Sequence, residues 1–451
     1  MGFYTKLVAS FLFPIHEQLK KHDTVRIRKD MEVTQWLSAE QLTVLQVSRL
    51  KQFLTDVGQH VPYYQQLFKR TGFNPESISS LEDLRQLPLT GKPLIREYSK
   101  QLKADDAQGL SKFNTGGSSG EPLIFYIGNK RVSHDVAAKW RATRWWGVDI
   151  GDVEAVIWGS PIELGGQDKI KLIRDKFLRT HLIPAFEMST AKIDGFIQQI
   201  KALKPKMLFG YPSALAHIAA HAETTGQVLN DLGIKVAFVT SERLYDHQRT
   251  KIEQVFACPV ANGYGGRDAG FIAHQCPAGN MHITAEDIIV EIVDNNGQCL
   301  PYGEAGEIVV THLATRDFPF IRYQTGDVGV LSNQVCSCGR GLPLLKEIQG
   351  RTTDFIVAQD GTVLHGLALI YILRDIEGIE SFKITQHSLD ETTVQIVKNQ
   401  HYKLESEVKI QYEFKQRLGE KVSINVDYIE LIAKEKSGKF RYVVSHVKPR
   451  S

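Results

Sequence analysis

Between about residues 120 and 330 the sequence alternates short β-branched runs with helix-like stretches. The runs include 154–158 and 235–240, and residues 193–203 between them show the apolar spacing of a helix. This alternation favours helices layered on a parallel sheet, because parallel strands need a crossover connection. Two more β-branched runs, 288–293 and 306–311, flank a polar turn. The sequence therefore predicts an α/β fold with a β-rich section.

Regions of different character flank this core. Residues 15–71 carry apolar side chains at helical spacing, and Gly72 is a plausible end of the last helix. After Gly350 the pattern predicts a helix, two strands, a helix and a strand at 367–374, 382–385, 393–397, 404–418 and 422–429. A chain of 451 residues is longer than one core usually serves. We expect a large multi-subdomain N-terminal domain with a helical N-terminal segment over 1–353, and a small α+β C-terminal domain over 354–451.

The first fourteen residues are mostly apolar, so a targeting signal, a lipid anchor, a membrane helix and a helix of the core all have to be considered. Ser10 interrupts the apolar run and no small-residue cleavage site follows, so we do not expect a secretory signal. Lys6 stands where the myristoylation pattern requires Ser or Thr. We expect a helix packed on the protein's own core, and a helix lying on a membrane is the alternative. No apolar run reaches the roughly 18 residues that a transmembrane helix needs.

Composition excludes some classes of protein. The net charge of +3 and the lack of Lys/Arg blocks argue against a nucleic-acid binder. The 42% hydrophobic and 23% charged content is that of an ordinary globular protein. Five cysteines in so long a chain fit a reduced, cytoplasmic setting better than a disulfide framework.

A glycine- and hydroxyl-rich turn precedes the apolar run 123–126. Its backbone N–H groups and hydroxyls suit phosphate oxygens. No Lys follows its last glycine, so it is not the GxxxxGK[ST] phosphate loop, and an ordinary loop has a similar composition. The residues of this turn are Thr115, Gly116, Gly117, Ser118, Ser119 and Gly120.

Four other polar, glycine-containing segments follow it along the chain. They are 262–270, with Tyr264, Gly265 and Asp268; 322–327, with Asp327; 350–354, with Arg351 and Asp354; and 434–441, with Lys439. Asp327 ends the β-rich section, where a carboxylate is well placed to hold a ribose diol. Each segment alone is equally consistent with a hairpin turn, a strand end, a linker or a solvated loop.

Taken together, and in this order, the segments resemble the adenylate-forming enzymes, which include acyl-CoA synthetases, luciferases and peptide-synthetase adenylation domains. The sequences at 60–64 (HVPYY) and 87–92 (LPLTGK) are similar to the phenylacetate–CoA ligase branch, near coenzyme F390 synthetase and capsule-biosynthesis members. The resemblance runs from about Gln41 to the end of the chain.

The resemblance implies an ATP- and Mg²⁺-dependent reaction. A carboxylate attacks the α-phosphorus of ATP to give an acyl-adenylate and pyrophosphate, and a thiol or an amine then takes the acyl group. Because both attacking and leaving groups are anionic, such catalysis consists mainly of positioning and charge neutralisation.

The implied residue roles follow the same order. The turn 115–120 would hold the β- and γ-phosphates, Tyr264 and Gly265 would lie at the adenine, and Asp327 would bind the ribose hydroxyls. Arg351 would reach the ribose or phosphates. Lys439 would bridge the carboxylate and α-phosphate oxygens, and Asp354 matches the hinge about which the small domain swings.

Asp268 departs from the family pattern, which has Glu as the magnesium contact at this position. Aspartate keeps the charge but is one methylene shorter, so the metal could be held through water. The departure leaves reduced or altered activity open.

Three cysteines and a histidine form a candidate metal site. Cys276, His282, Cys336 and Cys338 make a complete tetrahedral zinc set, which would be structural because no open position remains. His274 is a rival fourth ligand, and scattered core cysteines are the alternative. Cys258 and Cys299 are expected to be ordinary residues.

The resulting hypothesis is an AMP-forming carboxylate ligase that uses ATP and a small carboxylate, with CoA as the default acceptor. One alternative delivers the acyl group to an amine of a sugar or cofactor in polysaccharide biosynthesis. The other is a non-catalytic nucleotide-binding relative. The acid, the acceptor and the oligomeric state do not follow from the sequence.

Overall fold

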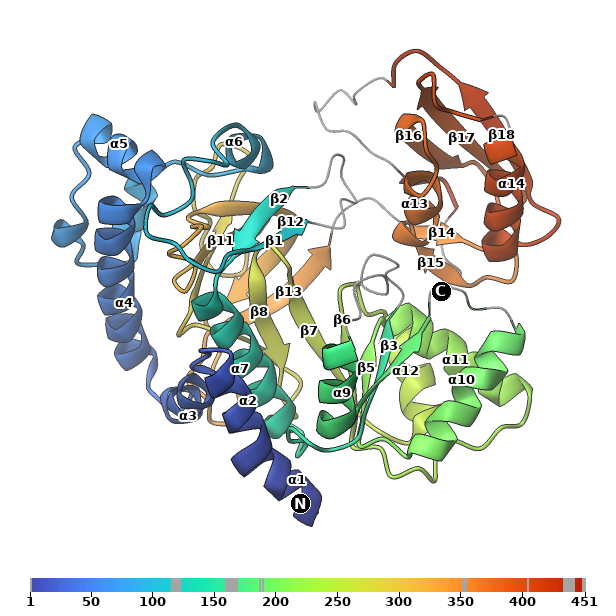
Figure 1. The fold of residues 1–451 in the computed structure, drawn as a ribbon, viewed down its shortest axis with the longest axis horizontal. Coiled ribbons are helices and arrows are strands. Elements are labelled where there is room, and N and C mark those ends of the chain that lie inside the picture. Colours follow the sequence, from blue (N-terminus) through green and yellow to red (C-terminus); the bar gives the residue numbers. More distant parts are fainter. Residues whose placement is uncertain are drawn as a thin grey trace.

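The computed structural model describes residues 2–114, 123–158, 169–185, 188, 190–350, 355–403, 405–432 and 443–447. The predicted turn 115–120, together with Arg351, Asp354 and Lys439, lies outside these ranges. An eleven-stranded sheet with the order β10-β11-β12-β13-β9-β8-β7-β6-β5-β3-β4 crosses the centre of the molecule (Figure 1).

One side of this sheet is parallel. Its strands are β3 (Glu154–Trp158), β4 (Thr180–Pro184), β5 (Met207–Gly210), β6 (Val236–Thr240) and β7 (Val260–Gly266). The helices that connect them are α9 (Lys169–Leu178), α10 (Thr190–Leu203), α11 (Pro212–Thr224) and α12 (Asp246–Phe256). Every residue of β6 is buried, as expected for a strand that is covered on both faces. The predicted strands and the helix at 193–203 are therefore confirmed.

The other side of the sheet is antiparallel and forms the predicted β-rich section. Its strands are β8 (Gly270–Gln275), β9 (Met281–Ile283), β10 (Ile288–Val293), β11 (Ala305–His312), β12 (Tyr323–Ser332) and β13 (Leu344–Gly350). A separate two-stranded ribbon joins β1 (Ser111–Asn114) to β2 (Ile124–Ile127), and α7 (Asn129–Trp145) follows it. Strand β7 belongs to both sides, because it pairs parallel with β6 and antiparallel with β8.

Helices dominate the N-terminal part, as predicted. They are α1 (Phe3–Leu7), the π-helical turn η1 (Val8–Leu12), α2 (Phe13–Leu19), α3 (Thr24–Thr34), α4 (Ala39–His60), α5 (Pro62–Thr71), the 3-10 turns η2 (Pro75–Ser77) and η3 (Glu82–Gln86), and α6 (Lys92–Glu97). Helix α4 begins at a capping box, in which Ser38 and Gln41 each bond the other's backbone N–H. Helix α5 ends at Gly72, whose φ of 68° is readily adopted by glycine. Among the described residues, no helix combines the length and apolar character needed to cross a bilayer.

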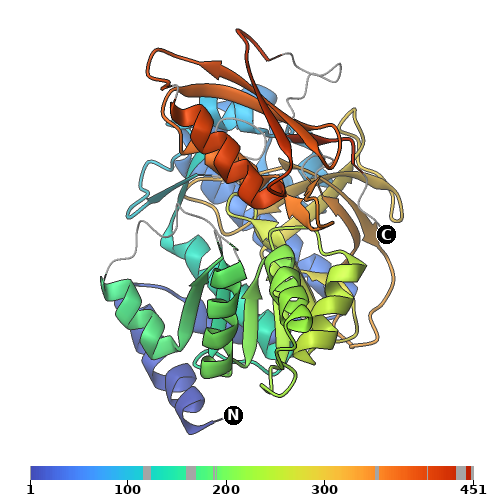
Figure 2. The ribbon, with the colours of Figure 1, turned by 90° about the vertical axis from the view of Figure 1, so that its right-hand side faces the viewer.

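The C-terminal elements form a second, smaller unit. They are β14 (Phe355–Val357), β15 (Val363–His365), α13 (Leu367–Arg374), β16 (Ile379–Gln386), β17 (Glu391–Lys398), α14 (Glu405–Leu418), β18 (Ser423–Tyr428) and β19 (Val443–Ser445). Their sheet has the order β18-β17-β16-β19, and their apolar core draws its buried residues from 356–443 alone. Figures 1 and 2 both show these elements gathered beside the large sheet rather than within it. The α+β class is as predicted, whereas a boundary at 353/354 falls among residues that are not described and stays a prediction.

Candidate functional site

Two of the predicted nucleotide-binding residues contact each other, although the strands that carry them are not neighbours in the sheet. Three other strands lie between these two strands. Tyr264 lies in β7 and Asp327 lies in β12. The Tyr264 hydroxyl donates to Oδ2 of Asp327 at 3.0 Å. An aromatic ring beside a carboxylate offers a stacking surface for a base and acceptors for a ribose diol.

Glycines after Tyr264 allow the chain to turn tightly. A Cβ on Gly265 would lie 2.2 Å from the carbonyl oxygen of Gly270, and one on Gly266 would lie 2.7 Å from Oδ1 of Asp268. The register of β7 and β8 shifts at Tyr264/Gly265, which marks a bulge. Glycine is therefore required at position 265, where the close atom belongs to the backbone. At position 266 a side chain would displace the Asp268 carboxylate.

The Asp268 carboxylate is held in place by its neighbours. It is nearly buried, and its Oδ2 accepts from the Tyr323 hydroxyl at 2.6 Å. Arg131, which is fully buried on α7, donates to the backbone oxygens of Asp268 at 2.8 Å and of Arg267 at 2.7 Å. A carboxylate with a fixed orientation and spare lone pairs could contact Mg²⁺ through water.

A buried ionic layer supports Arg131. Its Nε lies 3.3 Å from Oδ2 of Asp135, whose other oxygen lies 3.5 Å from Nε2 of His312. Burial alone would raise the pKa of Asp135, but the Arg131 charge and the His312 ring bring that pKa below its usual value. Asp135 therefore remains a carboxylate and keeps the Arg131 guanidinium directed at the turn.

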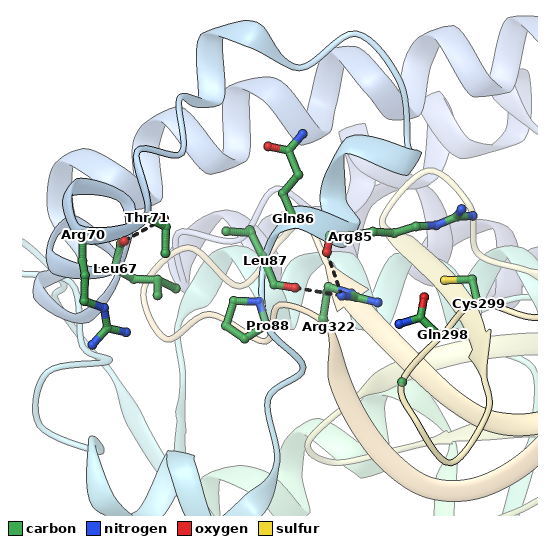
Figure 3. Close-up of a pocket in the computed structure, with 11 residues that line it drawn as sticks. Leu67, Arg70, Thr71, Arg85, Gln86, Leu87, Pro88, Gln298, Cys299 and Arg322 are labelled. Atoms are coloured by element: carbon green, nitrogen blue, oxygen red, sulfur yellow. Dashed lines mark hydrogen bonds between the residues drawn. The ribbon is translucent and has the colours of Figure 1, made fainter.

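Arg322 fixes the start of β12, and so the placement of Tyr323 and Asp327. Its guanidinium donates to both oxygens of Glu291 at 3.0 Å and to the Leu87 carbonyl at 2.8 Å. Arg322 and Leu87 border a cavity of about 460 Å³ between α5, the segment at 85–88 and the turn at 297–299 (Figure 3). None of the predicted site residues that the structure describes lines this cavity, so we assign Arg322 a structural role.

A second cavity, of about 500 Å³, lies beside Gly265 and Gly266. Its walls are mainly apolar and aromatic, and they include Phe113, Trp158, Phe209 and Phe271. Lys139 is one of its charged lining residues; its Nζ lies 3.0 Å from Glu154 and 3.9 Å from the ring centre of Phe209. Trp145 and Trp146, at the end of α7, do not line this cavity. Their indole nitrogens instead bond Gln35 and the Gln275 backbone.

The structure brings the four predicted metal ligands together. The ligand atoms of Cys276, His282, Cys336 and Cys338 all lie within 4.8 Å of one another. The sulfurs of Cys276 and Cys336 are 3.6 Å apart, which is too far for a disulfide and close to the roughly 3.8 Å expected between two thiolates on a tetrahedral zinc. The ligands come from the β8–β9 turn, β9 and the β12–β13 connection, so an ion here would join these segments.

The surroundings of the cluster suit a metal. Nδ1 of His282 lies 3.2 Å from the Leu342 carbonyl, which favours a proton on Nδ1 and leaves Nε2 facing the cysteines. Burial lowers the pKa of His282 to about 4, so the ring is neutral, as a ligand must be. His274 is not part of the cluster; it is buried with its ring against Phe238 and Phe271.

Sequence reasoning missed Arg131 and Tyr323 as residues that position the site. Nothing in the local pattern of α7 distinguishes Arg131 from a helix-surface arginine. Tyr323 directly follows Arg322 in a segment that the sequence did single out. Its contact with Asp268, 55 residues away, depends on how β12 approaches the β7–β8 turn.

Comparison with known families gives two matches. Residues 179–314 match the model described as AMP-binding enzyme, and residues 356–446 match the CapK C-terminal domain. Protein CapK of Staphylococcus aureus is 25% identical over 422 residues, which cover 92% of each chain. A phenylacetate–coenzyme A ligase of Thermus thermophilus is 25% identical over 378 residues, covering 80% of this chain and 82% of that protein.

Solved structures agree with the fold. A 2-hydroxyisobutyryl-CoA ligase, solved with 2-HIB-AMP and CoA in its thioesterification state, has a TM-score of 0.65 and 22% identity. The match covers 91% of this chain and 90% of that ligase. The same ligase in its postadenylation state has a TM-score of 0.59. Over most of its length the chain is therefore similar to the adenylate-forming enzymes, and among them to the phenylacetate–CoA ligases and to CapK.

Proposed function

We propose that this protein is an ATP-dependent, AMP-forming ligase that activates a carboxylic acid and transfers the acyl group to CoA. The observation that carries the proposal is the Tyr264–Asp327 pair beside the 500 Å³ cavity at Gly265 and Gly266. The pair offers contacts for a nucleoside, and the adjoining cavity offers an apolar space for an acid. A site that joins the two allows the carboxylate to meet the α-phosphate.

Each step then has a residue type that suits it. The pair Tyr264 and Asp327 orients the nucleoside, so that the carboxylate oxygen can attack the α-phosphorus while pyrophosphate leaves. We assign Lys439 to the negative charge that develops on the α-phosphate, since a compact ammonium can follow shifting charge. The turn 115–120 and Arg351 would bind the phosphates, and Asp354 would be the hinge of the C-terminal part. These assignments rest on position in the family pattern.

We assign the Mg²⁺ contact to Asp268. Both of its oxygens accept hydrogen bonds, one from Tyr323 and one from the Ala269 N–H, yet each keeps a free lone pair. The carboxylate therefore fits a metal held through water. Bound Mg²⁺ would neutralise phosphate charge.

We further propose that the cysteine cluster holds a structural Zn²⁺. Burial raises the pKa of Cys276 to about 11, so this thiol keeps its proton until a bound cation such as zinc stabilises the thiolate. Thiols that stay reduced fit a cytoplasmic protein.

Pyrophosphate release with a broad panel of carboxylates tests the ligase proposal, and mass analysis of the products with and without CoA identifies the acceptor. We expect at least one acid to stimulate pyrophosphate release and to give an acyl-CoA. If no acid stimulates pyrophosphate release, the hypothesis of a carboxylate ligase is contradicted for the classes of acid tested.

Transfer to an amine of a sugar or cofactor is the second candidate, because the CapK resemblance covers nearly the whole chain. In that case the mass analysis would find the same products with and without CoA, and a set of amino sugars would accept the acyl group. A protein that binds ATP but never forms an acyl-adenylate would instead be the non-catalytic relative.

A further inference from the structure

The first helical segment of the chain presents an apolar stripe to solvent. It continues from α1 through the π-helical turn η1 into α2, since the joining residues all keep right-handed helical geometry. One face is packed, with Val8 and Phe13 buried against Trp140. Five apolar side chains, spaced four residues apart, are exposed: Phe3 (86%), Leu7 (36%), Phe11 (63%), Ile15 (54%) and Leu19 (81%).

The π-helical turn Val8–Leu12 keeps this stripe narrow. In an α-helix of 3.6 residues per turn, positions four apart rotate by about 40° around the axis at each step. Across the π turn the N–H of Phe13 donates to the carbonyl of Val8, five residues back. Each residue of a π turn therefore rotates less about the axis than in an α-helix, and positions four apart shift around the axis in the opposite direction. The middle of the stripe is therefore realigned with its ends. Such π turns occur often at functional sites.

The charges beside the stripe are cationic. Lys6, Lys20 and Lys21 are exposed, whereas Glu17, the one acid among residues 2–22, is buried among polar neighbours. Among residues 2–22 the exposed charges are therefore all positive and lie beside exposed apolar side chains. The next acid along the chain, Asp23, is exposed but is paired with Arg26 at 3.0 Å.

Helix α9 extends the same surface. The Tyr4 hydroxyl bonds the backbone oxygen of Phe177, whose side chain is 56% exposed. The Arg179 guanidinium lies over the Tyr4 ring at 3.9 Å. Figure 1 shows α1 and α2 projecting from the body of the molecule, so a large flat partner could reach this face.

We propose that the helix at residues 3–19 docks this protein on an anionic phospholipid surface. The stripe would enter the region between head groups and acyl chains, while the lysines meet lipid phosphates. The membrane affinity of an interfacial helix rises with its buried apolar area and with the attraction of its basic residues to anionic lipids, and cytoplasmic leaflets supply the negative charge. A second copy of the chain fits less well, because a two-fold contact would set these lysines against one another.

Sedimentation of the full chain with lipid vesicles tests the proposal. We expect binding to vesicles that mix phosphatidylcholine with phosphatidylglycerol, weaker binding to phosphatidylcholine alone, and a further loss as salt rises. The double variant Phe11→Ser/Ile15→Ser should bind roughly 100-fold more weakly, or about tenfold for each apolar side chain lost. Lys20→Glu/Lys21→Glu should remove the preference for the anionic lipid.

The matched control is Val33→Ser/Val408→Ser, which replaces two side chains that are equally exposed (69% each) but lie off the stripe. It should bind vesicles as the wild type does. All variants should keep the wild-type melting temperature and pyrophosphate release, because none of these side chains is buried. No vesicle binding by the wild type would overturn the proposal, as would equal binding by the stripe variant. A dimer that the stripe variant disperses, without lipid binding, would assign the face to a second copy.

Discussion

The Tyr323→Phe variant tests whether Asp268 contacts the metal. It removes one oxygen atom, the hydroxyl that donates to Asp268 at 2.6 Å, and keeps the buried ring packed edge-on against Phe320. A hydrogen bond to a charged group contributes about 1.5–3 kcal/mol. If that energy orients the carboxylate for Mg²⁺, its loss raises the half-saturating Mg²⁺ concentration about 10- to 100-fold, since 1.4 kcal/mol corresponds to a factor of ten.

The assay is pyrophosphate release at saturating ATP and acid, measured over a range of Mg²⁺ concentrations. Tyr64→Phe is the matched control, because Tyr64 is an equally buried tyrosine on α5 and lies outside the site. Its Mg²⁺ dependence should equal that of the wild type. If Tyr323→Phe melts at a lower temperature but keeps the wild-type Mg²⁺ dependence, the hydrogen bond stabilises the fold and Asp268 is not the metal contact.

Three other predictions address different parts of the molecule. Lys439→Ala should abolish acyl-adenylate formation while calorimetry still detects ATP binding; loss of binding as well would remove its catalytic assignment. Elemental analysis should find about one zinc per wild-type chain and almost none in Cys336→Ser, which should also melt at a lower temperature, whereas Cys299→Ser should retain zinc; a metal-free wild type would refute the site. Burial raises the pKa of Glu242 to about 7, so the folded state holds a proton that the unfolded state has lost, and stability should fall as pH rises from about 4.5 to 7. Glu242→Gln should flatten this slope in urea titrations, and an unchanged slope would locate its origin in another group.

Local patterns in the sequence predicted most of the fold. The helix at 367–374 has the bounds expected from its apolar spacing, and β3 coincides with the run 154–158. Short strands that depend on distant partners were missed. Strand β19 has three residues and exists because it pairs with β16, about 60 residues earlier. The β14–β15 hairpin was also missed, since three-residue strands carry too little periodicity to detect.

The candidate site was predictable in its residue types but not in its supports. Tyr264, Asp327 and the cysteine cluster stand in recognisable segments, and the structure brings the members of each set together. Arg131 acts on the backbone of residues more than 130 positions away, a relation that one sequence cannot reveal. The choice between His274 and His282 also required coordinates, because both flank the same turn and only the packing separates them.

Strand β7 has a consequence for how such an enzyme could change its substrate. Its parallel neighbour β6 belongs to one half of the sheet and its antiparallel neighbour β8 belongs to the other half. The strand ends at Gly265 and Gly266, which line the apolar cavity and directly follow the nucleoside contact Tyr264. Side chains such as Trp158 and Phe209, on the parallel half, can be exchanged without touching Asp327 or Tyr323 on the other half. A lineage could therefore replace the acid that it accepts and leave its ATP chemistry intact, provided that the glycines at the end of β7 are kept. Chimeras joined at this strand are the natural way to exchange acid specificity between members of the branch.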